Sequence, residues 1–263
     1  MSYVSSRREH LIDRYNFAHP GNRDLDKHIL KGGKESAEKV VLHSRYKAGF
    51  ERDLRGNLQR DANHLNSSQM FCFNLMEPMR SVSQLSMLKC LLARKPFAIP
   101  LKGNIVDTRY EYVASTKENT HFDFVVKTDL LETVYFEFKY TESGFKKGKL
   151  SSERVDFYRQ WFHYSSNLKD LINKQGESEL ERHYQIYRNV SYVRGEHEFS
   201  VFLFPCANKV LDEELSEVRG LCQFVNVRVV HVEDVIDALL SGEVTGSKAL
   251  MSYYKNFDDF YLS

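Results

Sequence analysis

The sequence predicts an α/β fold with a mixed central sheet flanked by helices, and three observations support it. β-rich runs at residues 110–113, 122–126 and 133–140 follow one another with polar connectors, which is typical of a three-strand meander. Apolar runs at residues 199–204 and 225–232 have the length and composition of buried strands. Helical patterns alternate with these later runs, so we expect them to extend the sheet that the meander begins.

Helices are expected between and around these strands. One is predicted over residues 68–76, where serine and asparagine N-cap candidates lead into an apolar segment. A second begins near Ser151 and carries an apolar stripe at three- and four-residue intervals, and a third covers residues 233–240. The aromatic tail, residues 253–262, is expected to dock on the core or on a second subunit, so a homodimer is one expected assembly.

Composition favours one structural domain in a cytoplasmic protein. The 263 residues contain no Gly/Ser/Pro-rich linker, and four cysteines without a CxxC pair indicate neither a zinc knuckle nor a disulfide framework. We expect neither an export signal nor a membrane span, because no apolar run approaches about 20 residues. Residues 1–60 hold 13 Lys and Arg against 8 Asp and Glu, although the whole chain carries only +1. They are expected to form a basic helical extension packed on or near the core, residues 61–263.

Two predicted strands carry a set of charged residues suited to metal chemistry. Asp123 lies on the middle strand of the meander, and Glu137 and Lys139 lie on the last. Side chains alternate along a strand, so Glu137 and Lys139 share one face while Phe136 and Phe138 take the apolar face. Carboxylates are the hard oxygen ligands that Mg²⁺ prefers, and a lysine beside them can orient water or stabilise a phosphate. This combination suits metal-assisted phosphodiester hydrolysis.

The pattern Asp123…Glu137-Phe138-Lys139 resembles the D…(D/E)xK signature of the PD-(D/E)XK nuclease superfamily, the restriction-endonuclease-like fold. His121 and Phe122 stand where the family name has a proline before the aspartate. The resemblance implies a Mg²⁺ site, in which Mn²⁺ can substitute, held by Asp123, Glu137 and the carbonyl of Phe138. It also implies that Lys139 orients or helps to deprotonate the attacking water.

Two further segments carry the resemblance. Gln160 and Tyr164 stand at i and i+4 on the second predicted helix and resemble the QxxxY element of RecB-like members; a surface glutamine beside a core tyrosine is the equal alternative. Residues 64–75, with the pattern NSSQ…FN, resemble a bacterial family of uncharacterised restriction-endonuclease-like proteins. Residues 183–189 and the strand 199–204, which ends in PCAN, fit the same family.

The third acid of the expected site has two candidates. Glu77, at the end of the 68–76 helix, is favoured slightly, and Glu111 on the first strand is second. The alternative for Glu77 is a solvated residue before Pro78, where the helix must stop or bend. Gln69 and Asn74 either face the cleft or serve as buried amides.

The expected function is a Mg²⁺-dependent endonuclease acting on DNA. Lys146, Lys147 and Lys149 follow the motif and could contact DNA phosphates, as could Tyr164, although mixed-sign surface helices are the commoner explanation for such basic clusters. The alternative is a catalytically silent member of the same fold that binds nucleic acid or a protein in a phage-defence or mobile-element system. The complete D…ExK set favours the enzyme.

Overall fold

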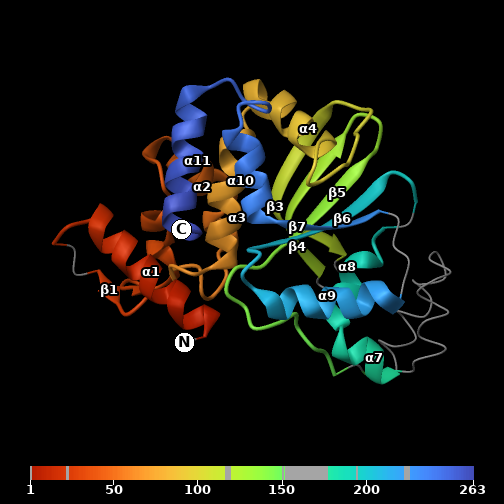
Figure 1. Ribbon diagram of the computed structural model, residues 1–263, viewed down its shortest axis with the longest axis horizontal. Coiled ribbons are helices and arrows are strands. Elements are labelled where there is room, and N and C mark those ends of the chain that lie inside the picture. The colour runs from red at the N-terminus through yellow and green to blue at the C-terminus, as the bar shows by residue number, and fades with distance from the viewer. Residues whose placement is uncertain are drawn as a thin grey trace.

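A five-stranded mixed sheet forms the centre of the protein in a computed structural model (Figure 1). The structure describes residues 2–21, 24–115, 120–149, 151, 177–193, 195–221 and 226–263. The predicted helix beginning near Ser151, with Gln160 and Tyr164, lies outside these residues. The mixed α/β fold predicted from the sequence is confirmed.

The sheet combines the predicted meander with two parallel strands. Its order is β3 (Ile105–Ser115), β4 (Thr120–Thr128), β5 (Thr133–Phe138), β6 (Glu198–Phe204) and β7 (Val227–His231). The β3–β4 and β4–β5 pairs are antiparallel, whereas β5–β6 and β6–β7 are parallel. Parallel pairing of β5 with β6 requires a crossover, and this crossover carries helices α7 and α8. The predicted strands all exist, and β3 extends well beyond the expected residues 110–113.

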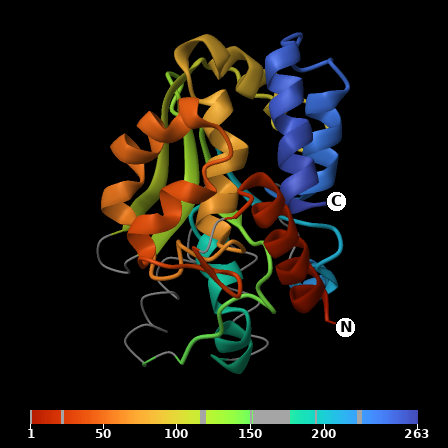
Figure 2. The same cartoon turned by 90° about the vertical axis from the view of Figure 1, so that its left-hand side faces the viewer.

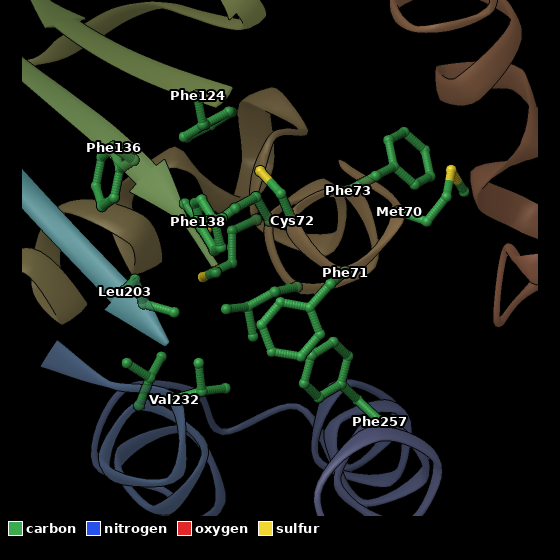
Figure 3. Packing of buried hydrophobic residues seen from close by; sticks show 14 of the residues in the cluster. Met70, Phe71, Cys72, Phe73, Phe124, Phe136, Phe138, Leu203, Val232 and Phe257 are labelled. Atoms are coloured by element: carbon green, nitrogen blue, oxygen red, sulfur yellow. The ribbon is translucent and has the colours of Figure 1, made fainter. Parts of the chain in front are cut away.

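One face of the sheet packs against helices from both halves of the chain. These are α3 (Ser68–Met76), α4 (Leu85–Ala93), α10 (Val232–Leu240) and α11 (Lys248–Tyr261). Phe136 and Phe138 point into this layer, as strand alternation predicts, and Figure 3 shows them with Phe71 of α3 and Phe257 of α11. The ring of Phe71 stacks on that of Tyr140 with centroids 4.5 Å apart. This large apolar layer fixes the position of the carboxyl end of β5.

The opposite face carries a smaller apolar cluster. Helices α7 (Glu177–Arg182), α8 (Tyr184–Val190) and α9 (Lys209–Leu221) contribute to it, and Figure 1 shows them on the other side of the sheet from α10 and α11. Phe202 and Phe204 of β6 point into this cluster, while Val201 and Leu203 point into the larger one. Strand β6 is therefore buried on both faces, as its predominantly apolar sequence predicts.

The N-terminal segment packs on the large layer. It contains α1 (Tyr3–Ala18), the short strands β1 (Leu25–Asp26) and β2 (Ile29–Leu30), and α2 (Lys47–Asp53). Short 3-10 helices join these elements and the start of α4: η1 (Lys34–Val40), η2 (Ser44–Tyr46), η3 (Arg55–Asn57), η4 (Glu77–Met79) and η5 (Val82–Gln84). Leu11, Leu30 and Phe50 are buried in the same cluster as the sheet residues. The basic extension therefore shares its apolar core with the rest of the chain.

The two ends of the chain hold each other. Figure 2 shows α1 beside the C-terminal end of α11. Nη1 of Arg7 donates to the carbonyl oxygens of Tyr261 and Ser263, and Nη2 of Arg14 lies 3.3 Å from Oδ2 of Asp259. Cations at the C-terminus of a helix interact favourably with its exposed carbonyls. The aromatic tail docks on the core, with Phe257 and Tyr261 fully buried. Within the described residues, no helix is long and apolar enough to cross a membrane.

Candidate active site

Asp123 and Glu137 approach each other where β4 and β5 separate. The ladder between these strands ends at the pair Phe124 and Phe136. Beyond it, Oδ2 of Asp123 accepts a 2.6 Å hydrogen bond from the backbone N–H of Phe138. This side-chain bond replaces the next ladder bond, so the Asp123 carboxylate lies over the end of β5. The two acids, 14 positions apart in the sequence, thereby line one cleft.

Glu137 is buried and surrounded by hydrogen-bond donors. Nζ of Lys139 lies 3.0 Å from its Oε1. Two amides of helix α8 also reach it: Nε2 of Gln185 donates to Oε1 at 2.5 Å, and Nδ2 of Asn189 donates to Oε2 at 2.8 Å. Strand alternation places Glu137 on the face that α8 covers, opposite the phenylalanines of β5. Three donors therefore hold this buried carboxylate in place.

Glu111 brings a third carboxylate to the cleft from β3. Its φ is 47°, in the left-handed region that residues other than glycine seldom adopt. The strand changes the face of its side chains here, because Tyr110 packs on Phe124 whereas Tyr112 lies near Tyr135 on the other side. Such strain costs about 1–3 kcal/mol and clusters at functional sites.

The side chains of two glutamines fix the Glu111 carboxylate. Nε2 of Gln69 donates to its Oε1 at 2.7 Å, and Nε2 of Gln59 donates to the same oxygen at 3.0 Å. Gln69 also bonds the backbone of residues 57 and 59. Of the two roles considered for Gln69, the structure therefore favours that of a buried amide, and this amide holds the cleft residue Glu111 in place. Asn74 is a scaffold amide, because it bonds Val40, Leu42 and the hydroxyl of Tyr261.

Burial and the neighbouring carboxylates oppose the ionisation of Glu111 and Asp123. Burial, together with the charge of Glu137, raises the pKa of Glu111 to about 7. The pKa of Asp123 is also well above its ordinary value, first because of burial and then because of Glu137 and Glu111. For Lys139, burial lowers the pKa, but Glu137, Glu142 and Asp123 outweigh it and raise the pKa above its ordinary value. Lys139 is therefore protonated at neutral pH, and a further cation among the acids would relieve their repulsion.

The donor set fits a hard divalent cation. Among the residues that the structure describes, no group of three or more His, Cys, Asp and Glu side chains is arranged to hold a metal by itself. Mg²⁺ usually takes only one or two protein carboxylates and fills its other positions with water and substrate phosphate. Asp123 and Glu137 provide two such carboxylates in one cleft, beside the predicted carbonyl ligand of Phe138. The site therefore suits Mg²⁺ or Mn²⁺ better than a metal that needs a complete protein cage.

The cleft itself is large and lined by charge. Its volume is about 1020 Å³, at the upper end of the roughly 300–1000 Å³ of pockets for small ligands. Acidic side chains and basic side chains from separate elements both line it. The basic residues are Arg8 of α1, Lys139 after β5, Lys146 of the connector and Arg188 of α8. A polyanion could contact these basic side chains while one of its phosphates lies near the acids.

Not every residue predicted for the site reaches the cleft. Oε2 of Glu77 accepts hydrogen bonds from Nη1 of Arg80 and the hydroxyl of Tyr110, and Glu77 does not line the cleft, whereas Glu111 does. Lys146 lines the cleft, but Lys147 and Lys149 are exposed outside it. Gln160 and Tyr164 belong to the part of the chain that the structure does not describe.

Gln185 and Asn189 are the residues that sequence reasoning missed. They lie within residues 183–189, which were assigned to the family resemblance without a role. The signal that could have found them is their i, i+4 spacing, the same spacing that singled out Gln160 and Tyr164. Helix α8 lies in the crossover between β5 and β6, and the amides on its polar face donate hydrogen bonds to Glu137.

The mixed sheet and its helical layers define a restriction-endonuclease-like fold. A family model described as "Restriction Endonuclease associating with ARP" matches residues 8–261, and the chain belongs to this family. The predicted resemblance to restriction-endonuclease-like proteins is confirmed over nearly the whole chain. Neither the curated proteins nor the solved structures contain a match to this sequence.

Proposed function

We propose that the protein is a Mg²⁺-dependent endonuclease that hydrolyses DNA phosphodiester bonds, with Mn²⁺ able to replace Mg²⁺. The observation that carries the proposal is the cluster of half-buried Asp123 with buried Glu137 and Lys139 in a charged cleft of a chain from a restriction endonuclease family. A structural ion pair would need only one acid for Lys139. The second and third acids add charge repulsion that destabilises the metal-free protein, and a bound cation would offset this repulsion.

Each residue of the cluster has a role in the proposed reaction. Asp123, Glu137 and the carbonyl of Phe138 would hold the metal, and a metal held there would supply Lewis-acid chemistry at the phosphate. Lys139 is protonated, so it would orient the attacking water by donating a hydrogen bond and stabilise negative charge on the phosphate. We propose Glu111 as the third acid in place of Glu77, because Glu111 lines the cleft and the Glu77 carboxylate pairs with Arg80.

DNA is the proposed substrate, and the basic side chains that line the cleft are its proposed contacts. Arg8 and Lys146 come from distant parts of the sequence and line the same cleft. Lysine and arginine contacts to phosphates supply affinity without reading sequence. Lys147 and Lys149 extend this basic surface outside the cleft. Roles for Gln160 in positioning water or phosphate and for Tyr164 in DNA contact remain predictions, as does a cytoplasmic location.

A metal-dependent plasmid-cleavage assay tests the proposal. Supercoiled plasmid is incubated with purified protein and Mg²⁺, Mn²⁺ or a chelator. Asp123→Ala, Glu137→Ala and Lys139→Ala should each lower the cleavage rate on the order of 10²-fold or more while the protein remains folded. Glu77→Gln, outside the cleft, should retain cleavage. Full activity of Glu137→Ala in a preparation free of contaminating nuclease would refute the assignment.

A second function has support in the family description, which names association with ARP. We propose that this chain also associates with such a protein partner. In the alternative to the nuclease, the protein is catalytically silent and binds this partner and DNA without cleaving the DNA. Binding of plasmid with no metal-dependent nicking, by wild type and Glu137→Ala alike, would favour this alternative.

A further inference from the structure

Helix α8 holds both carboxylate oxygens of Glu137. Nε2 of Gln185 donates to Oε1, and Nδ2 of Asn189 donates to Oε2. The two amides are four residues apart and therefore lie on one face of the helix. Both are buried, with exposed fractions of 3 % and 0 %. A buried pair of amides aimed at one acid restricts the rotation of that carboxylate.

The carbonyl oxygens of the same amides are also used. Oε1 of Gln185 accepts a 2.9 Å hydrogen bond from the backbone N–H of Lys146. Oδ1 of Asn189 accepts from Nη2 of Arg188 at 3.2 Å. An amide whose oxygen faces a donor must direct its NH₂ group the other way, so these bonds fix the direction in which each side chain donates. The orientation of both amides toward Glu137 is therefore determined on two sides.

A count of lone pairs shows which acceptor positions of the Glu137 carboxylate are open to a ligand. A carboxylate offers about four acceptor positions, two on each oxygen. Among the described residues, Oε1 receives Gln185 and Lys139, whereas Oε2 receives Asn189 alone. Within the described part of the protein, the open acceptor position is thus on Oε2. Glu137 is arranged to offer a cation one oxygen.

We propose that Gln185 and Asn189 are positioning residues that orient Glu137 for binding of the divalent metal. The inference rests on the proposed function, since it assigns the metal to Glu137. Hydrogen-bond partners of metal-binding side chains typically contribute about 10- to 100-fold in metal affinity or activity. Without these amides, Lys139 is the one donor to Glu137 left among the described side chains, and the open oxygen can turn toward that cation instead of the metal.

A purely structural role makes a different forecast. Buried amides also stabilise folded proteins, so their loss lowers the melting temperature whatever they do to a metal. Metal affinity in the absence of DNA separates the two roles. Ser191 offers a matched control, because its hydroxyl donates a 2.6 Å bond to the carbonyl of Arg188 at the end of α8 without contacting Glu137.

The test is calorimetric titration of metal-free, DNA-free protein with Mn²⁺. Gln185→Met and Asn189→Leu keep roughly the side-chain size and remove the donors. Each should bind Mn²⁺ about 10- to 100-fold more weakly than wild type. Ser191→Ala should lose thermal stability and keep wild-type affinity. Thermal unfolding without metal identifies folded variants, and Gln185→Ala, which admits water to Glu137, replaces Gln185→Met if that variant does not fold.

The outcomes separate this inference from the proposed function. Wild-type Mn²⁺ affinity in folded Gln185→Met and Asn189→Leu would overturn the positioning role and leave the nuclease proposal standing. Equal weakening by Ser191→Ala would also overturn it, since distortion of α8 would then explain the loss. A wild-type protein that neither binds Mn²⁺ nor cleaves DNA would overturn both.

Discussion

Nζ of Lys139 lies 3.0 Å from Oε1 of Glu137, and the exposed fractions of the two side chains are only 8 % and 5 %. Their separation of two residues places them on the same face of the chain as it leaves β5. Because the pair is shielded from water, each charge depends on the other and on the few donors around it. Removal of one partner leaves a buried charge, which is far more costly than the loss of an exposed ion pair.

Lys139→Met should therefore destabilise the metal-free protein by about 3–5 kcal/mol. The free energy of unfolding is measured by urea denaturation near pH 8. Lys127→Met on β4 is the control. Nζ of Lys127 donates to the neutral hydroxyl of Tyr112, so its loss leaves no unpaired buried charge and should lower the free energy of unfolding by less. Adding Glu137→Gln to Lys139→Met should restore part of the stability. Equal losses for the two lysine variants would contradict the dependence of Glu137 on Lys139.

Glu111 should make the stability of the metal-free protein depend on pH. Its pKa rises from 4.5 to about 7 on folding, so between these values the folded state binds more protons than the unfolded state. Stability then falls as pH rises through this window and levels off above about 7. Glu111→Gln should reduce the fall between pH 5 and pH 8, measured by urea unfolding. A residual fall is expected from Asp123, whose pKa is also raised.

Glu132→Gln provides the control, because the pKa of Glu132 is lowered on folding whereas that of Glu111 is raised. Burial raises the pKa of Glu132, but hydrogen bonds from the N–H groups of Lys102 and Gly103 and from Thr128 outweigh burial and lower it. Its stabilisation is lost only below pH 5, so this variant should be uniformly less stable from pH 5 to pH 8 with an unchanged slope. An unchanged slope in Glu111→Gln would show that Glu111 titrates normally.

The strands and the D…ExK set were predictable because they depend on local patterns. Alternation along residues 133–139 assigns Glu137 and Lys139 to one face without any knowledge of the partner strands. The predominantly apolar sequence of β6 likewise predicts burial on both faces. The turns and short 3-10 helices of residues 31–67 were not predicted, because tertiary packing holds them rather than a periodic pattern.

The choice between Glu77 and Glu111 required the structure. Both acids adjoin apolar segments, and sequence position alone favoured the helix. Which of them reaches the cleft depends on the reversal of faces at Glu111, where φ is 47°, and on the pairing of Glu77 with Arg80 across space. Neither feature has a sequence pattern. Gln185 and Asn189 differ, since their spacing was visible and only the path of the crossover assigned them to Glu137.

The basic connector should contribute salt-dependent DNA affinity. Replacing Lys146, Lys147 and Lys149 together with glutamine should weaken binding similarly across sequences, because phosphate contacts release counterions without reading bases. The slope of log affinity against log salt should become shallower, as measured by fluorescence anisotropy with a labelled duplex in the absence of divalent metal. A matched triple variant removes exposed lysines outside the cleft: Lys95, Lys102 and Lys255. Identical slopes for the two triple variants would assign the connector to a solvated loop.

Asp123→Asn should separate a metal site from a structural ion pair. Burial and the charges of Glu137 and Glu111 oppose ionisation of Asp123, so removing its charge should leave the metal-free protein equally or more stable. Wild type should gain about 2.7 kcal/mol of stability when free Mg²⁺ or Mn²⁺ is a hundred times its dissociation constant. The variant should lose most of that gain.

Thermal unfolding of both proteins, with metal and with chelator, measures the two quantities together. The amide introduced by Asp123→Asn retains an acceptor for the N–H of Phe138, so the bond that joins β4 to β5 can persist. A carboxylate that stabilises only by its attraction to Lys139 makes the opposite forecast, because its loss lowers the melting temperature whether or not metal is present. The structural alternative would be established if the variant is less stable than wild type in chelator and the melting temperature of wild type does not change with Mg²⁺ or Mn²⁺.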